Sequence, residues 1–157
     1  MKHINLNQNE IFAIPNSLWS IKGLKFLDLS NNKLGTQKVE GGYLSEAIAE
    51  CEGLVEFHAS GNQLTELPNS LGNLRYLEVL DLKDNKISSL PDSFGCLERL
   101  LKLNLDGNCL KVVPACIGNL QTLSELSLAK NQIKAIENDC LIPLGNLVTL
   151  TLHQNML

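Results

Sequence analysis

An eleven-residue pattern, L-x-x-L-x-L-x-x-N-x-L, recurs seven times in this chain of 157 residues and constrains its fold more than any other feature. Successive copies start 23, 30, 23, 23, 23 and 24 residues apart, so the repetition covers the chain from end to end. Such a period indicates a stacked array, in which each unit buries its apolar face against its neighbours. The copies begin at Met1, Leu24, Leu54, Leu77, Leu100, Leu123 and Leu147.

Each copy contains a segment in which leucine alternates with other residues, as in Leu80-Asp81-Leu82. This alternation predicts a short β-strand that points its leucines into the core and the residue between them toward solvent. Because the copies stack in one direction, we expect the strands to form one parallel sheet, with about 4.8 Å between neighbours. The outward side chains should then form one continuous face.

An asparagine follows each predicted strand, where the chain has to turn. Its amide group has two donor hydrogens and an acceptor oxygen, so it can bond backbone groups of its own unit and of the adjoining one. Such groups would cost about 1–3 kcal/mol each if they were buried without a partner. We therefore assign a structural role to an asparagine ladder made of Asn9, Asn32, Asn62, Asn85, Asn108, Asn131 and Asn155.

The second half of most units contains an aliphatic residue followed by proline, as in Leu67-Pro68 and Leu90-Pro91. Proline has a fixed φ and no N–H group, so it suits a coil that leaves the sheet. This repeat resembles the leucine-rich-repeat superfamily, in particular the intracellular type of the Ras-suppressor and scribble proteins. The resemblance implies an α/β solenoid, a curved right-handed coil with a seven-stranded parallel sheet on its concave face and irregular or 3-10 segments on its convex face. The chain is then one domain, 1–157, with repeats 1–23, 24–53, 54–76, 77–99, 100–122 and 123–146 and a partial repeat 147–157.

The second repeat is longer than the others and carries a different pattern. Its apolar residues Leu44, Ala47, Ile48 and Cys51 follow the i, i+3, i+4, i+7 spacing, which predicts one α-helix over 44–51. Gly53 is placed to end this helix in a left-handed cap. The segment resembles the ribonuclease-inhibitor type of repeat, in which a helix covers the convex side.

The repeat pattern is already in register at Met1 and is interrupted at Leu157. Repeat arrays generally need capping units, because a terminal coil otherwise exposes strand edges and leucines. We therefore expect the chain to be a fragment of a longer array. Two alternatives stay open: a short protein that self-associates through its uncapped ends, or an end that tolerates exposure.

Composition and charge limit the classes of partner. The net charge is −4, and the outward-facing rows of the predicted sheet carry more acidic than basic residues, so we expect neither nucleic acid nor membrane as a partner. The cysteines are odd in number, lie in different repeats and form no C-x-x-C pair, which argues against zinc and favours a reduced, cytoplasmic protein without a cofactor. These cysteines are Cys51, Cys96, Cys109, Cys116 and Cys140.

The predicted concave face offers a candidate binding surface over repeats 2 to 5. Phe26 and Val79 are apolar at positions that should face solvent, which is typical of an interface centre, although isolated apolar residues also occur there. His58 should lie between Asp28 and Asp81, two acids that would favour its charged form. It is either a pH-sensitive contact or a counter-charge for the two aspartates. The full candidate surface comprises Phe26, Asp28, Glu56, His58, Val79, Asp81, Lys102 and Asn104.

These residues do not predict an enzyme. Ser60, His58 and Asp81 are the residue types of a catalytic triad, but they should project in parallel from an open sheet that offers no oxyanion donors. We therefore predict a non-enzymatic protein-interaction module, a scaffold or adaptor in signalling. The resemblance leaves an alternative open: the recognition segment of a larger signalling enzyme of the kinase, phosphatase, ubiquitin-ligase or GTPase type. GTPase activation is disfavoured, because Arg75 and Arg99 fall in predicted convex segments rather than on the concave face.

Overall fold

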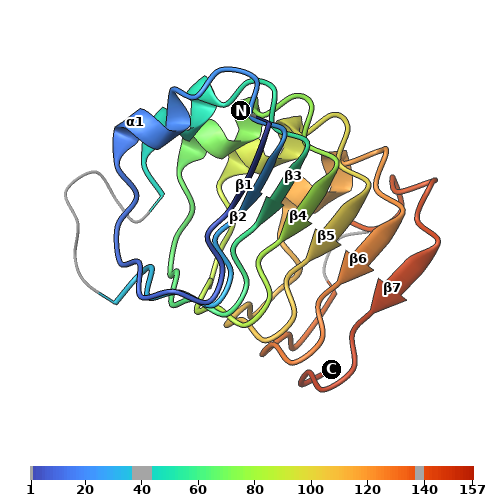
Figure 1. Cartoon of the computed structure of the whole chain (residues 1–157). Coiled ribbons are helices and arrows are strands. Elements are labelled where there is room, and N and C mark those ends of the chain that lie inside the picture. Colours follow the sequence, from blue (N-terminus) through green and yellow to red (C-terminus); the bar gives the residue numbers. More distant parts are fainter. Residues whose placement is uncertain (1, 37–43, 137–139) are drawn as a thin grey trace.

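Seven parallel strands, paired in chain order, form one open sheet along the inner face of a solenoid (Figure 1). The computed structural model describes residues 2–36, 44–136 and 140–157. Each strand pairs in register with the next repeat, as in Leu80 opposite Leu103. The predicted leucine-rich-repeat solenoid and its seven-stranded parallel sheet are thus confirmed. The strands are β1 (His3–Asn5), β2 (Phe26–Asp28), β3 (Glu56–His58), β4 (Val79–Asp81), β5 (Lys102–Asn104), β6 (Glu125–Ser127) and β7 (Thr149–Thr151).

Short helices form a second layer on the side of the solenoid away from the strands (Figure 1). Four of them start directly after the proline of the repeat, whose φ lies between −61° and −68°. Since the pyrrolidine ring fixes φ near this value, it orients the chain for the first turn. The helices are α1 (Asn16–Trp19), η1 (Glu46–Glu50), η2 (Asn69–Asn73), η3 (Asp92–Cys96) and η4 (Ala115–Asn119), where η denotes a 3-10 helix.

The predicted α-helix over 44–51 is wrong in type. This segment forms the 3-10 helix η1, and the α-helix of the described chain lies in the first repeat. Consecutive i→i+3 hydrogen bonds, from Ile48 N to Ser45 O and from Cys51 N to Ile48 O, place buried residues above one another. Gly53 does not adopt a positive φ, so the predicted left-handed cap is also absent, and the helix ends at Glu50, followed by Cys51 with φ −77°.

The core lies between the strands and the helices and consists mainly of leucine. Leu27, Leu54 and Leu77 are fully buried, and each such side chain contributes about 1.5–3 kcal/mol of transfer free energy. Trp19 and Phe57 meet edge to face in the same core, with 6.5 Å between ring centroids. The stacked leucines fix the strands and thereby the outward side chains between them.

The asparagine ladder ties each turn of the solenoid to the preceding one. Asn85 is typical: its Nδ2 donates to the carbonyl oxygens of Ala59 and Leu82, both at 3.0 Å, and its Oδ1 accepts the N–H of Leu64. Equivalent bonds form at the buried residues Asn32, Asn62, Asn108 and Asn131.

The two terminal members of the ladder are less enclosed. Asn155 is half-buried and keeps its bonds to the previous repeat, whereas Asn9 is exposed and donates only to Leu6 and Asn7 of its own repeat. The energetic contribution of the ladder is therefore expected to be greatest in the middle of the array.

Candidate functional site

The concave face displays two rows of side chains, which the strand pairing places side by side. Asp28, His58 and Asp81 occupy adjacent strands in one row, and Asn104 continues that row. The second row contains Phe26, Glu56, Val79 and Lys102. All eight residues of the predicted binding surface therefore lie on β2 to β5.

A shallow hollow of about 280 Å³ lies on this face over β4 to β6. It contains five of the eight predicted residues, but Phe26, Asp28 and Glu56 lie outside it. The sequence interpretation missed its C-terminal part, although the same two rows continue through repeats 6 and 7. The outward side chains that line the hollow are His58, Val79, Asp81, Lys102, Asn104, Glu125, Ser127 and Thr149.

Phe26 is not an isolated apolar residue. Its ring stacks on the imidazole of His3, with 4.0 Å between centroids and 2° between planes. The imidazole of His58 lies 5.4 Å away at a tilt of 39°. These three rings form an aromatic cluster at the N-terminal end of the concave face, and His58 connects this cluster to the hollow.

The carboxylate that His58 contacts directly is neither of the two that the sequence predicted beside it. Its Nε2 lies 3.6 Å from a carboxylate oxygen of Glu56, which belongs to the same strand. Asp28 is instead engaged by Ser30 N at 2.9 Å and by Asn7 Nδ2 at 3.0 Å. Burial opposes ionisation of Asp28, but these hydrogen bonds and the nearby His58 outweigh it and lower the pKa of this carboxyl.

The acids and amides of the Asp28 row also stabilise the turn that follows each strand. In four of them a side-chain oxygen accepts the N–H group two residues further on: Asn7 for Asn5, Ser30 for Asp28, Lys83 for Asp81 and Asp106 for Asn104. This bond closes the turn after the strand. A partner can therefore use only the remaining acceptor capacity of these side chains.

Charge on the face is predominantly negative. Lys102 pairs with Glu125 at 2.7 Å, which offsets its positive charge within the hollow. Both side chains are about half exposed, and such surface pairs contribute about 0–1 kcal/mol. Asp28, Glu56 and Asp81 are the other acidic residues of the two rows on β2 to β5.

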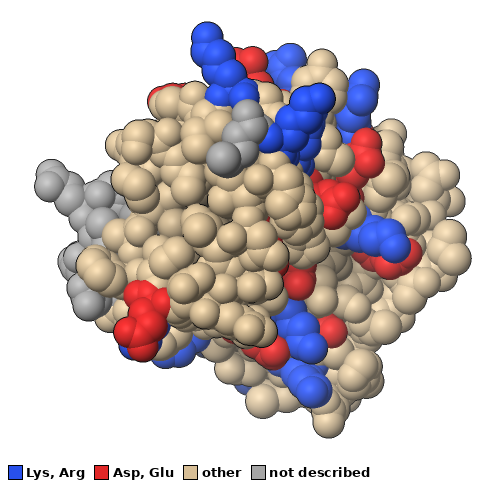
Figure 2. Space-filling model, viewed as in Figure 1, with Lys and Arg blue, Asp and Glu red and all other residues tan. Residues whose placement is uncertain are grey.

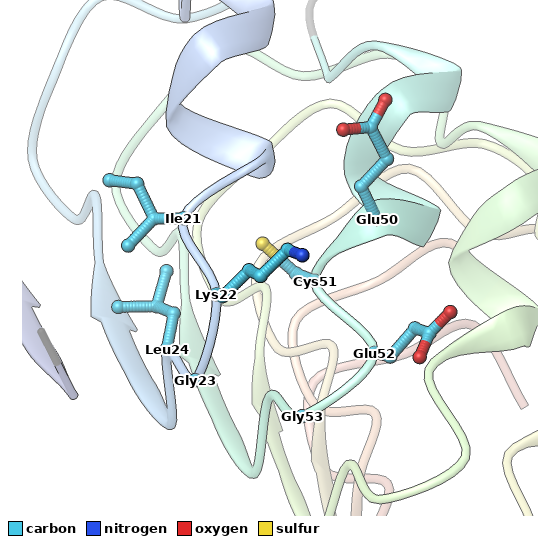
Figure 3. Close-up of a pocket in the computed structure, with 8 residues that line it drawn as sticks. All are labelled: Ile21, Lys22, Gly23, Leu24, Glu50, Cys51, Glu52 and Gly53. Carbon is cyan, nitrogen blue, oxygen red and sulfur yellow. The ribbon is translucent and has the colours of Figure 1, made fainter.

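A second hollow, of about 450 Å³, lies between the segments that lead into β2 and β3 (Figure 3). Lys22, Glu50 and Glu52 supply its charged groups. Cys51 also lines it and donates from Sγ to the carbonyl oxygen of Trp19 at 3.1 Å. Burial, reinforced by the charge of Glu50, raises the pKa of Cys51 to about 11, so the thiol stays protonated near neutral pH and is a poor nucleophile.

In the described part of the chain, no three or more His, Cys, Asp or Glu side chains gather in a way that would hold a metal ion. Within the same residues, no helix has the length and apolar character required to cross a membrane.

A family model described as a leucine-rich repeat region matches residues 1–155. No curated protein sequence matches the chain. Similar solved structures include a leucine-rich-repeat protein of Leptospira interrogans, with 30% identity and a TM-score of 0.89 over 99% of this chain and 38% of that one. An internalin of Listeria monocytogenes has 26% identity and a TM-score of 0.82 over 99% of this chain and 42% of that chain.

A third similar structure is the Arabidopsis receptor kinase HAESA in complex with the peptide hormone IDA and a co-receptor. It shares 31% identity and a TM-score of 0.77 over 96% of this chain and 26% of that chain. The chain thus spans less than half the length of each of these three proteins.

Proposed function

Because this chain belongs to the leucine-rich-repeat family, we propose that it is a non-enzymatic module that binds a partner protein on its concave face. The hollow over β4 to β6 is the observation that supports this proposal best. Its lining comes from side chains whose backbones are fixed by the sheet before any partner arrives. Little backbone entropy is then lost on association, which favours binding.

The partner surface should be basic or mixed in charge and should carry an apolar group. Val79 is the apolar residue of the hollow's outward rows, and Asp81 and Glu125 lie in the same hollow. The one lysine of those rows, Lys102, is already paired with Glu125. Complementary charge would steer the partner toward the face and set its orientation.

We infer a role as a scaffold or adaptor in signalling. The likeness to HAESA, whose solved complex contains a peptide hormone and a co-receptor, supports a polypeptide ligand. It also favours a second candidate, in which this array is the recognition segment of a larger signalling protein. The free thiols of Cys51, Cys96, Cys109 and Cys116 support our placing of the protein in a reducing, intracellular compartment.

The experiment is capture of a partner from the source cells on immobilised protein, followed by affinity measurements with purified components. Val79→Arg puts a bulky cation into the hollow and should lower the affinity for the captured partner by about tenfold or more. Val148→Arg is the matched control, because Val148 is 85% exposed and lies outside the hollow. Equal affinities for the two variants, with unchanged circular dichroism, would refute binding on the concave face.

A further inference from the structure

A cation–aromatic cluster lies away from the hollow, at the edge of the solenoid where the strands begin. Tyr76, directly before Leu77 of repeat 4, is 48% exposed. The guanidinium carbon of Arg99 lies 4.8 Å from the centre of its ring, and the ammonium of Lys25 lies 5.7 Å from it. Both distances are within the range of cation–π attraction.

Lys25 reaches Tyr76 across a glycine. Lys25 belongs to repeat 2 and Tyr76 immediately precedes repeat 4, so one strand separates them. Gly53 lies in between, and a Cβ atom there would come within 3.3 Å of the Lys25 Nζ. The missing side chain therefore leaves space for the ammonium group beside the aromatic ring.

Among the residues that the structure describes, the cations of this edge form no ion pair. The ion pairs of residues 2–36, 44–136 and 140–157 join Lys33 to Glu10, His58 to Glu56 and Lys102 to Glu125. Neither Lys25, Arg75 nor Arg99 takes part in them, and all three residues are exposed.

A hollow of about 470 Å³ adjoins the ring and is lined by Ala49, Glu52, Asn73, Arg75 and Tyr76. Glu52 supplies an acidic group there, but it forms no ion pair with Arg75. Figure 2 shows Lys and Arg side chains gathered at the top of the molecule, where β1 to β5 begin, with acidic side chains between them.

An exposed apolar side chain completes this edge. Leu101 follows Arg99 by two residues and is 40% exposed. Tyrosine and arginine are the residue types that contribute most at protein interfaces, and an aliphatic neighbour adds apolar area. The edge therefore combines an aromatic anchor, an apolar residue and cations that form no ion pair with any described residue, with Glu52 beside them.

We propose that this Tyr76 flank, made of Lys25, Arg75, Tyr76, Arg99 and Leu101, is a second docking surface that binds an acidic segment of a protein partner. A carboxylate of that segment pairs with the guanidinium groups of Arg75 or Arg99, for which their planar donors are suited. An apolar residue of the segment packs on Tyr76 and Leu101. The surface is separate from the concave face, so this inference stands independently of the proposed function.

The test is an NMR titration of the whole chain with a Glu-Glu-Leu-Glu-Glu peptide at low ionic strength, with Lys-Lys-Leu-Lys-Lys as the probe of opposite charge. We expect saturable shifts of the Tyr76 flank with the acidic peptide only. Arg99→Gln and Tyr76→Ala should each weaken binding about fivefold, as expected for exposed contacts of this kind. Tyr76→Phe keeps the ring and should bind like the unmodified chain.

Two control variants locate the binding. Lys134→Gln removes an exposed cation elsewhere in the chain, and Val79→Ala alters the concave hollow; neither should change the affinity for the acidic peptide. The proposal is overturned if the acidic peptide does not bind, if both peptides bind equally, or if Lys134→Gln weakens binding as much as Arg99→Gln. A loss in Val79→Ala alone would place the peptide on the concave face and would also overturn it.

Discussion

The imidazole of His3 lies flat on the ring of Phe26, with 4.0 Å between their centroids. This contact joins β1 to β2 on the concave face, outside the leucine core. Aromatic pairs of this kind contribute about 0.5–1.5 kcal/mol beyond the area they bury. The stack thus stabilises the first repeat from the side that faces solvent.

Replacement of Phe26 by alanine should lower the free energy of unfolding by about 1 kcal/mol, because it removes the stack with His3 and the contact with His58. Urea denaturation monitored by circular dichroism measures this change. Phe12→Ala is the control, since Phe12 is 48% exposed and has no ring partner in the described chain, and it should change stability by less than about 0.5 kcal/mol. Equal losses for the two variants would contradict a stabilising stack.

The asparagine ladder predicts a strong dependence on position. Asn85→Ala leaves the N–H of Leu64 without its partner and removes one of the two amide donors that each of the Ala59 and Leu82 carbonyls accepts. It should therefore cost about 2–4 kcal/mol. Asn9→Ala should cost less than about 1 kcal/mol, because Asn9 is exposed and bonds only within its own repeat. Thermal and urea unfolding of both variants measure these losses in the free energy of unfolding. Similar losses for the two variants would contradict a stabilising role of the bonds between repeats.

Glu46 links two neighbouring helices and should make stability depend on pH. Its carboxylate accepts the N–H groups of Asn69 and Ser70 at the start of η2, at 3.0 and 2.8 Å. The Ser70 side chain and these N–H groups lower the pKa of Glu46. Burial raises it, but by less than the hydrogen bonds lower it. Because the folded-state pKa is the lower one, the stabilisation is present above the unfolded pKa of about 4.3 and is lost as the pH falls through the folded value.

The variant Glu46→Gln should therefore be less stable than the unmodified chain near neutral pH, and the difference should shrink as the medium becomes strongly acidic. Denaturant unfolding at a series of pH values measures the trend. Glu66→Gln, at an exposed residue that accepts no hydrogen bond in the described structure, should show no such convergence. A constant difference for Glu46→Gln would contradict the proposed linkage.

The thiols should differ widely in reactivity. Burial, and then the charges of Glu50 and Asp92, raise the pKa values of Cys51 and Cys116 to about 11, whereas Cys96 is exposed. Iodoacetamide near pH 8 should therefore label Cys96 first. Labelling of Cys51 and Cys116 in the folded chain should accelerate about tenfold per pH unit up to about pH 11. Peptide mass spectrometry resolves the sites, and equal rates at pH 8 would contradict this order.

The sequence predicts the parts of this molecule that depend on periodicity. The leucine alternation places Asp28, His58 and Asp81 in adjacent strands, because register follows directly from the spacing of the repeats. The spacing was ambiguous at 44–51, where apolar residues three apart suit a 3-10 helix as well as an α-helix. The segment η1 packs against both α1 and η2, and the local pattern does not encode these contacts.

Contacts that depend on side-chain direction could not be predicted in this way. The choice of Glu56 as the ion-pair partner of His58 and the stack of His3 on Phe26 depend on rotamers. The cluster of Lys25, Tyr76 and Arg99 joins residues of different repeats across Gly53, and no local motif marks it. The turn-closing bond of Asp28 was missed, although an aspartate at the end of a strand is a residue type that suggests such a bond.

The parallel strands have a mechanical consequence. Their backbone hydrogen bonds run between neighbouring repeats, along the axis that connects the first strand to the last. Tension applied to the two ends of the chain therefore loads these bonds one row at a time instead of all together. Such an array should unfold one repeat at a time at low force. Single-molecule stretching should therefore record a gradual lengthening rather than one abrupt rupture.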